Sequence, residues 1–240
     1  MIDIIAVSFV SDIHSNLEAL QAVLADIDNK VEDEVETKIF CLGDIVGYGA
    51  SPNEVITLLN DNRVTCISGN HDQAALSGDT TGFNATAAEA VFWTFRHLDS
   101  NSMEFLKMLP LDAAFKVGGK RVYLVHGSPD NQLWEYARVE THEVLFGSYL
   151  TRVHADVLGL GHTHLPFVWR GPEGLVFNPG SVGQPRDGDS RASYATLTLD
   201  DSGGIELLHR RVDYDVGTAA QKITDSGLPL QLGDRLFIGR

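Results

Sequence analysis

The sequence predicts an α/β protein in which layers of β-sheet are flanked by helices within one domain, residues 1–240. In the first half of the chain, apolar strand-like runs alternate with helix-like runs, which is typical of strands joined by helical crossovers. In the second half, pairs of strand-like runs are separated by short turns, which is typical of hairpins. The chain has 240 residues, of which 43% are hydrophobic, and this is enough for one well-buried core.

The first elements follow from continuous apolar runs, which indicate strands buried on both faces. We expect three such strands, "IIAVSFV" (4–10), "IFCL" (39–42) and "VTCIS" (64–68). A helix is expected after the first strand, because Ser15 and Glu18 form a capping box. Its apolar positions recur at helical spacing, at Leu17, Leu20, Leu24 and Ile27. The acidic stretch 28–38 is expected to be a solvated loop.

The remaining elements are a second helix, one long helix, three hairpins and a short strand. Ser51 and Glu54 form another capping box with Pro52 at the first helical position, so a helix is expected there. Apolar spacing predicts a helix over 86–109. The short strand is expected within 155–164, and the hairpins join 113–117 to 121–127, 166–170 to 175–180, and 192–199 to 205–212.

The charge of the chain argues against general nucleic-acid binding. With 18 Lys and Arg against 33 Asp and Glu residues, the formal net charge is −15, so the surface repels polyanions. Cys41 and Cys66 each lie in an apolar run, which favours buried free thiols in a reducing compartment, although a disulfide between them stays open. No basic segment precedes the first apolar run, and no apolar stretch reaches the roughly 20 residues that span a bilayer. We therefore expect a cytoplasmic protein without a membrane partner.

Side chains able to bind metal follow five of the predicted strands. In chain order they lie in Asp12-Ile13-His14, Gly43-Asp44, Gly69-Asn70-His71-Asp72, His126-Gly127 and Gly161-His162-Thr163-His164. In open α/β sheets ligands bind at the carboxyl ends of strands, so these motifs are expected to converge on one site. Imidazole, carboxylate and amide groups without cysteine suit zinc, iron or manganese. A central carboxylate is able to bridge two ions, an arrangement that serves displacement at phosphorus.

Each motif alone also has an ordinary structural interpretation. A lone Asp-x-His or Gly-Asp is usually a turn, and a lone buried histidine is usually a packing residue. Five motifs in this order, each at a strand end, favour a metal site instead. The other four histidines lie within helix-like or strand-like stretches, and we expect ordinary surface or packing roles for His97, His142, His154 and His209.

The order of the five motifs resembles that of the calcineurin-like metallophosphoesterases. The longer strings "GDIVGYGASPNEV" and "FNPGSVGQPRDGDSRASYA" resemble a branch of small bacterial and archaeal members, grouped with diadenosine tetraphosphatases and YfcE-like phosphodiesterases. The resemblance spans residues 11–195. It implies a four-layer α/β/β/α sandwich of two mixed sheets flanked by helices.

The resemblance also implies a role for each residue of the motifs. Two divalent ions are implied (manganese, iron or zinc, with manganese favoured), together with a hydroxide between them that attacks phosphorus. His71 would protonate the leaving oxygen, with Asp72 orienting its ring. One ion would be held by Asp12, His14 and His164, the other by Asn70, His126 and His162, and both by Asp44.

One departure from related families concerns the phosphate-binding cation. Serine/threonine phosphatases of this superfamily resemble Gly-Asp-x-Val-Asp-Arg-Gly at the second motif, whereas this chain reads "GDIVGYG" and has no arginine there. Arg186 in a glycine-rich loop is therefore expected to contact substrate, as is Asn70. The alternative is that Arg186 only pairs with Asp187 or Asp189.

The sequence as a whole predicts a phosphoesterase that acts on a small phosphoester. Phosphodiester, phosphomonoester and dinucleoside polyphosphate substrates stay open, and the oligomeric state is not predicted. The alternative from another class is a metal-holding regulatory or binding module without turnover. A purely structural α/β protein is disfavoured, because it leaves the histidines at the strand ends without a purpose.

Overall fold

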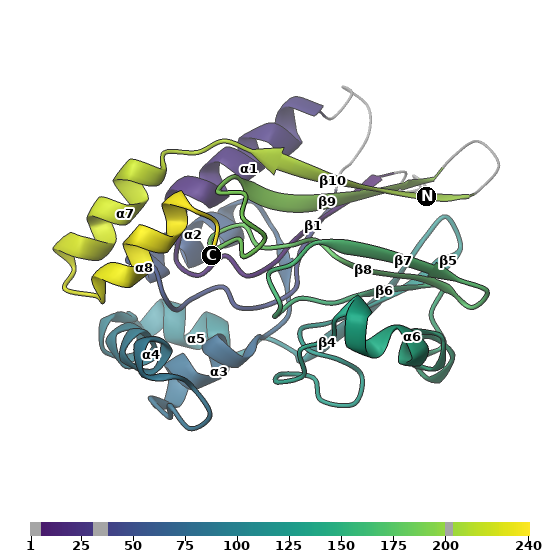
Figure 1. The fold of residues 1–240 in the computed structure, drawn as a ribbon, viewed down its shortest axis with the longest axis horizontal. Coiled ribbons are helices and arrows are strands. Elements are labelled where there is room, and N and C mark those ends of the chain that lie inside the picture. The colour runs from purple at the N-terminus through teal and green to yellow at the C-terminus, as the bar shows by residue number, and fades with distance from the viewer. Residues whose placement is uncertain (1–5, 31–37, 200–203) are drawn as a thin grey trace.

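The computed structural model describes residues 6–30, 38–199 and 204–240 and contains two five-stranded sheets (Figure 1). The first has the strand order β10-β9-β1-β2-β3 and the second β4-β5-β6-β8-β7. Both sheets are mixed. In the first, β1, β2 and β3 are parallel and β9 and β10 add antiparallel pairs on one side. In the second, the parallel strands β5, β6 and β8 are flanked by the antiparallel edge strands β4 and β7. The strands are β1 (Ala6–Val10), β2 (Lys38–Cys41), β3 (Thr65–Cys66), β4 (Asp112–Val117), β5 (Lys120–Val125), β6 (Val157–Gly159), β7 (Phe167–Gly171), β8 (Gly174–Asn178), β9 (Ala192–Leu199) and β10 (Ile205–Val212).

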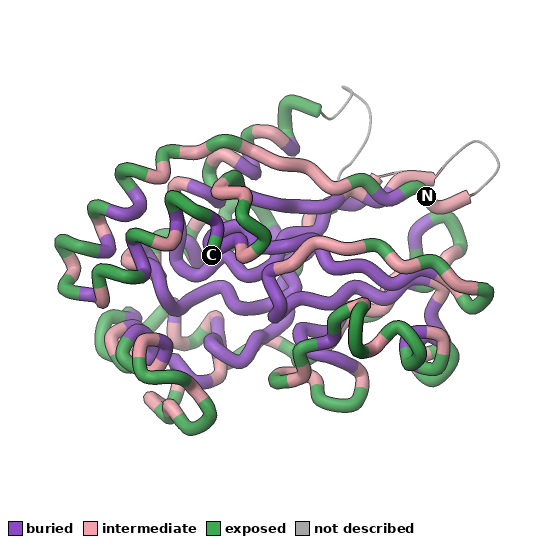
Figure 2. The backbone as a smooth tube through the Cα atoms, in the orientation of Figure 1, coloured by how far each residue is buried: buried purple, intermediate pink, exposed green. Residues whose placement is uncertain are grey.

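The two sheets pack face to face over one apolar core. Phe9 of β1 contacts Phe177 of β8 across this interface, with the ring centroids 4.8 Å apart. Side chains of β2, β5, β6 and β9 belong to the same cluster, which includes Phe40, Leu124 and Val157. Figure 2 shows the central strands almost wholly buried. Removing these apolar side chains from water supplies the main driving force that holds the sheets together.

Helices cover the outer face of each sheet. The apolar side of α1 packs on the first sheet through Leu20 and Val23, and α6 packs on the second through Phe146 and Leu150. In Figure 1, α1 lies above the two sheets and α6 below them, so the fold is the α/β/β/α sandwich that the resemblance implied. The helices are α1 (Leu17–Lys30), α2 (Pro52–Asp61), α3 (Asn70–Ser77), α4 (Ala85–His97), α5 (Ser100–Lys107), α6 (Val139–Val153), α7 (Val216–Asp225), α8 (Leu230–Asp234) and the 3-10 helix η1 (Arg235–Phe237).

The expected start of the first helix is wrong by one residue. Asn16, not Ser15, caps α1, because its side-chain oxygen accepts a hydrogen bond from the Ala19 N–H at 3.1 Å. Ser15 instead has a positive φ of 54° and donates its backbone N–H to the Ile45 carbonyl. It belongs to the turn that places His14. Ser51 does precede α2, with Pro52 at the first helical position, but its side chain makes no capping hydrogen bond.

The long helix expected over 86–109 is two helices, and this expectation is corrected. α4 ends at His97, and the Asp99 carboxylate accepts the Ser102 N–H at 2.7 Å to cap α5. Helix α3 was not expected. It is only eight residues long and opens with polar residues, so its apolar spacing is weak. Part of the expected acidic loop is also helical, since α1 runs to Lys30, while 31–37 lie outside the described residues.

All three hairpins and the short strand β6 form as expected. Gly118 and Gly119 both have positive φ, the backbone that a tight two-residue hairpin turn requires. Cys41 and Cys66 are neighbours on the parallel strands β2 and β3, and both are buried free thiols, as expected. Within the described ranges, no helix has the length and apolar character needed to cross a bilayer.

Candidate metal centre

Tight turns at the strand ends bring the five motifs together. Left-handed backbone, which is rare for side chains other than glycine, occurs at five of the expected ligands, namely Asp12, His14, Asp44, His162 and His164. Residues held in this conformation cluster at functional sites, where the surrounding fold over-determines them. Gly69 allows α3 to approach Asp44 closely, since a Cβ there would lie 2.1 Å from Asp44 Oδ1.

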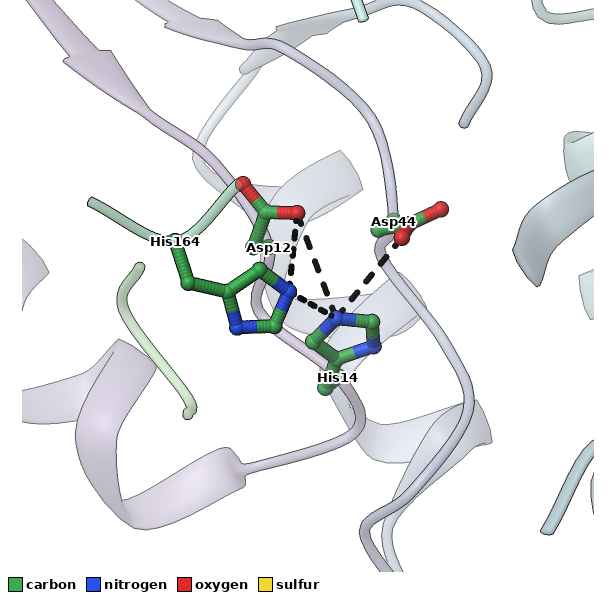
Figure 3. A group of neighbouring side chains, drawn as sticks. All are labelled: Asp12, His14, Asp44 and His164. Carbon is green, nitrogen blue, oxygen red and sulfur yellow. Dashed lines mark hydrogen bonds and ion pairs between the residues drawn. The ribbon is translucent and has the colours of Figure 1, made fainter. Parts of the chain in front are cut away.

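The first group of donors contains Asp12, His14, Asp44 and His164, all buried (Figure 3). The Nε2 atoms of His14 and His164 are 3.1 Å apart. Asp12 Oδ1 lies 3.3 Å from His164 Nε2, and Asp44 Oδ2 lies 3.7 Å from His14 Nε2. Figure 3 shows these ring nitrogens and carboxylate oxygens pointing toward one another. Such a convergence of donors is the arrangement of a metal site.

The second group contains Asp44, His126 and His162. Asp44 Oδ2 lies 3.3 Å from His126 Nε2, so the same oxygen faces both groups. The amide oxygen of Asn70 is 3.2 Å from His126 Nε2, which adds it to the second group. Asp44 Oδ1 accepts the His71 N–H at 2.8 Å, and this bond fixes the carboxylate. The structure therefore brings all seven expected ligands into two groups that share Asp44.

Backbone carbonyls orient three of the imidazoles. Nδ1 of His14 faces the Val46 carbonyl at 3.1 Å, Nδ1 of His126 faces that of Leu42 at 2.8 Å, and Nδ1 of His164 faces that of Gln184 at 2.6 Å. An imidazole that donates Nδ1–H to a carbonyl presents the lone pair of Nε2, which is the usual second support of a metal-binding histidine.

Unpartnered buried atoms show that the donor set fits two cations. Asp12 Oδ1 and His162 Nε2 are buried and make no hydrogen bond, although such atoms are nearly always satisfied in folded proteins. Both atoms face the donor groups described above. Burial raises the pKa of Asp12 to about 7, and a nearby cation would lower this pKa again because it favours the charged carboxylate.

The ionisation of the other ligands agrees with this fit. Burial lowers the pKa of His14 and His164 well below the usual range and that of His162 to about 3, so these rings are neutral. Burial opposes charge on Asp44 and His126 too, but their mutual attraction outweighs it. The Asp44 pKa is well below its usual range and the His126 pKa is about 9. A divalent ion would replace the proton that His126 carries.

His71 lies beside the two donor groups without belonging to either. Its ring is 4.8 Å from that of His14 and 4.5 Å from that of Tyr48, measured between centroids. Its Nδ1 is buried without a partner, and a Cβ on Gly47 would lie 2.4 Å from that atom. Burial lowers the pKa of His71 to about 4. Aromatic neighbours therefore pack against the ring, and Gly47 leaves the space that the ring occupies because glycine has no side chain.

Asp72 does not orient the His71 ring, and that expectation is wrong. Its Oδ1 accepts the backbone N–H groups of Ile45 and Val46 at 2.9 and 3.0 Å, and its Oδ2 accepts that of Gly69 at 2.9 Å. The carboxylate thus joins the start of α3 to the loop that carries Asp44. A carboxylate this close to three otherwise unpaired N–H groups satisfies them rather than the ring of the residue before it.

Arg186 extends toward the donor groups from the loop after β8. Its guanidinium lies 5.9 Å from the centre of the Tyr48 ring, which itself packs against His14 with the centroids 4.6 Å apart. The alternative pairing with the neighbouring aspartates is not formed. Asp187 pairs with Arg211 and Asp189 with Arg191.

The four remaining histidines lie apart from these donor groups. His97 stacks on Trp93, and His209 Nε2 bonds the Asn178 carbonyl at 2.7 Å. His142 Nε2 is 3.4 Å from Glu135, and His154 ends α6 in the left-handed conformation. These are packing and surface contacts, as expected.

Sequence reasoning missed Tyr48 and Gln184. Tyr48 lies against His14 and His71, and Gln184 supplies the carbonyl that orients His164. The only signal for Tyr48 was its place in "GDIVGYG", close to Asp44. Gln184 acts here through its backbone, so no side-chain pattern marks that role.

Comparison with known proteins identifies the family of the chain. A family model described as calcineurin-like phosphoesterase superfamily domain matches residues 5–202. The uncharacterized protein MJ0912 of Methanocaldococcus jannaschii is 41% identical over 254 residues, covering 98% of each chain.

Two solved structures share the whole fold. A metallophosphoesterase from Sphaerobacter thermophilus is 32% identical with a TM-score of 0.78, over 98% of this chain and 99% of that one. The hypothetical protein PH1004 from Pyrococcus horikoshii OT3 has a TM-score of 0.87 at 24% identity, over 98% of both chains, and shows the same fold. The chain described here belongs to the calcineurin-like phosphoesterase superfamily.

Proposed function

We propose that this protein is a phosphoester hydrolase that depends on two divalent metal ions. The observation that carries the proposal is the position of Asp44, whose Oδ2 faces His14 on one side and His126 on the other. A carboxylate shared by two groups of imidazoles is suited to hold two ions close together. The family membership supports the phosphoesterase class.

The chain's own residues divide the work. Asp12, His14 and His164 would hold one ion and Asn70, His126 and His162 the other, with Asp44 contacting both. When bound, the ions supply a hydroxide nucleophile near neutral pH and neutralise charge on the phosphoryl oxygens.

His71 would contact the phosphoryl group and donate a proton to the leaving oxygen. Its buried place beside the donor groups is suited to this role. An anionic phosphoryl group beside the ring raises its pKa from the low value of the free site, because opposite charge favours the protonated form. Arg186 would contact a phosphoryl oxygen, as would the Asn70 amide.

We favour manganese among manganese, iron and zinc, and a small phosphoester over a long nucleic acid. The net charge of −15 supports the second choice, since counterion release cannot drive the binding of a polyanion without a basic surface. Two buried free thiols support a cytoplasmic location. The rival is a metal-holding module without turnover. The placement of His71 disfavours such a module, because a histidine that is not a metal ligand is not needed to hold the metal.

The test of the proposal is metal content together with hydrolysis. The protein loaded with manganese, iron or zinc is assayed on bis-p-nitrophenyl phosphate, p-nitrophenyl phosphate and diadenosine tetraphosphate. We expect hydrolysis of at least one substrate, two equivalents of metal in the wild type, and loss of at least one equivalent in Asp44→Asn.

Asp99→Asn is the matched control, because Asp99 is an exposed helix cap where asparagine serves equally well. It should keep both metals and full activity. Two equivalents bound with unchanged affinity in Asp44→Asn would rule out the bridge. Two tightly bound ions in a wild type that hydrolyses none of the three esters would favour the metal-holding module.

A further inference from the structure

Two arginines meet at one acceptor beside the candidate metal centre. Arg186 Nη2 donates to Oε1 of Gln184 at 3.0 Å, and Arg235 Nη1 donates to the same oxygen at 3.5 Å. Arg186 belongs to the loop after β8, whereas Arg235 begins η1 near the end of the chain. Residues 186 and 235 are thus brought together only by the fold.

In the part of the chain that the structure describes, neither arginine of the pair forms an ion pair with a carboxylate within 4.0 Å, although the chain contains 33 Asp and Glu residues. The nearby Asp187 and Asp189 are taken by Arg211 and Arg191. The Nε atom of Arg186 is buried and has no hydrogen-bond partner. Two adjacent guanidinium groups with spare donors fit an anion.

Gln184 connects this pair to the metal ligands. Its backbone carbonyl accepts from Nδ1 of His164 at 2.6 Å, while its side-chain oxygen accepts from both arginines. On the other side, Arg186 lies over Tyr48, whose ring packs against His14 and His71. The arginine pair therefore lies next to the place where the phosphoryl group would bind.

Space for a larger substrate lies beyond Arg235. This arginine lines an open cavity of about 320 Å³ together with Asn84, Thr86, Gln231, Asp234, Ile238 and Arg240. The segment that carries Arg235 packs through Leu232 and Leu236 in one cluster with Tyr48 and Ala87, so it is a fixed wall of the site. It lies outside residues 5–202, which the family model matches.

We propose that Arg186 and Arg235 form a subsite for a second phosphate, so that the substrate carries two adjacent phosphates joined by an anhydride bond. This inference rests on the proposed function, because it places the first phosphate at the metal ions. The substrate class is then a diphosphate or longer polyphosphate compound rather than a simple phosphodiester.

The test compares two anions on the protein with its metals bound. Inorganic phosphate reports the metal site alone, and imidodiphosphate, which resists hydrolysis, reports both phosphate positions. Titration calorimetry gives each affinity, and metal content is measured after each titration so that chelation is not mistaken for binding. We expect imidodiphosphate to bind the wild type at least ~10-fold more tightly than phosphate, the effect of one charged hydrogen bond.

Variants of Arg235 test whether this side chain binds the second phosphate. Arg235→Gln should weaken imidodiphosphate by roughly 10–100-fold, because charge-assisted hydrogen bonds are lost, and phosphate by much less. Arg235→Lys should recover part of the loss, which keeps the test valid if the glutamine variant folds poorly. Arg96→Gln is the control, since it removes the same charge from an exposed arginine that lies over Phe92. It should change neither affinity.

The outcomes separate this inference from the proposed function. If the wild type hydrolyses bis-p-nitrophenyl phosphate but Arg235→Gln and Arg235→Lys weaken both anions equally or neither, the second-phosphate subsite is refuted and the hydrolase stands. If the wild type hydrolyses no ester yet Arg235→Gln selectively weakens imidodiphosphate, the subsite stands and the hydrolase fails.

Discussion

His71 is the residue whose role differs most from that of its neighbours. It is buried among the rings of His14, Tyr48 and Phe83, and it reaches the donor groups without being one of them. Packing residues and proton donors respond differently to substitution. His71→Ala should keep both metals and the melting temperature, and lose roughly 10²–10⁴-fold in rate, the usual effect of a positioned acid.

The leaving group decides between the two roles of His71. A nitrophenolate departs without a proton, so its ester should show a smaller loss than an alkyl or nucleoside ester. Rates for both esters, metal content and melting temperature are measured together. His97→Ala is the control, because that ring stacks on Trp93 and lies apart from the donor groups. Equal losses for both esters would leave His71 as a hydrogen-bond donor to the phosphoryl oxygens.

The identity of the ligands could be predicted from the sequence, but not what holds them. All seven expected donors meet, because each follows an apolar run that ends at the same side of the fold. The groups that orient these ligands could not be predicted, because backbone carbonyls such as those of Leu42 and Val46 occur in every residue type. Asp72 was misjudged for the same reason, because its partners are backbone N–H groups.

At the scale of elements, α3 is fixed against the loop of Asp44 by close backbone contact. A Cβ on Gly69 would lie 2.1 Å from Asp44 Oδ1 and 2.3 Å from the Asp44 nitrogen. Gly69→Ala should therefore displace Asp44 and weaken metal binding by roughly 10–100-fold, the usual effect of disturbing the support of a ligand. Metal titration with a competing chelator measures this.

Gly217→Ala is the matched control for this prediction. It lies in the first turn of α7, where the nearest atom to a new Cβ is 3.4 Å away. Alanine there should keep the metals and leave stability the same or slightly higher. A Gly69→Ala variant that binds both metals as tightly as the wild type would show that α3 yields to the new methyl group.

Elements with strong local signals were predictable, and those defined by side-chain hydrogen bonds were not. Turns that contain glycine predicted the hairpins, and both Gly118 and Gly119 adopt the positive φ that such turns need. The break between α4 and α5 depends on the Asp99 carboxylate reaching the Ser102 N–H, which competes with an apolar spacing that continues through it. Asn16 replaced Ser15 as a cap in the same way.

At the scale of the whole molecule, each donor group draws on both sheets. Asp12 and His14 follow β1 of the first sheet, whereas His164 follows β6 of the second, and Asn70 and His126 are divided likewise. Bound ions would therefore fasten the sheets to each other. Because an ion that binds only the folded state adds about 2.7 kcal/mol at 100 times its Kd, chelation should lower the melting temperature by roughly 5–10 °C.

Differential scanning calorimetry before and after treatment with a chelator checks this, with restoration by added metal as the control for damage. Gly69→Ala should show a smaller shift, since its sites are already weakened. An unchanged melting temperature after complete removal of metal would mean that apolar packing alone joins the sheets.

Because the expected ligands are far apart in the sequence, they leave the ribosome at different times during synthesis. Asp12 leaves the ribosome 164 − 12 = 152 residues before His164, which is about 8–30 s at ~5–20 residues per second. β9, which lies between β1 and β10, emerges later still. Neither group of donors is complete before His162 and His164 have emerged, so the ions would bind only after most of the chain has been made. The metal found in a purified sample would therefore depend on which divalent ions were available in the cell at that time. Affinity alone discriminates little among such ions.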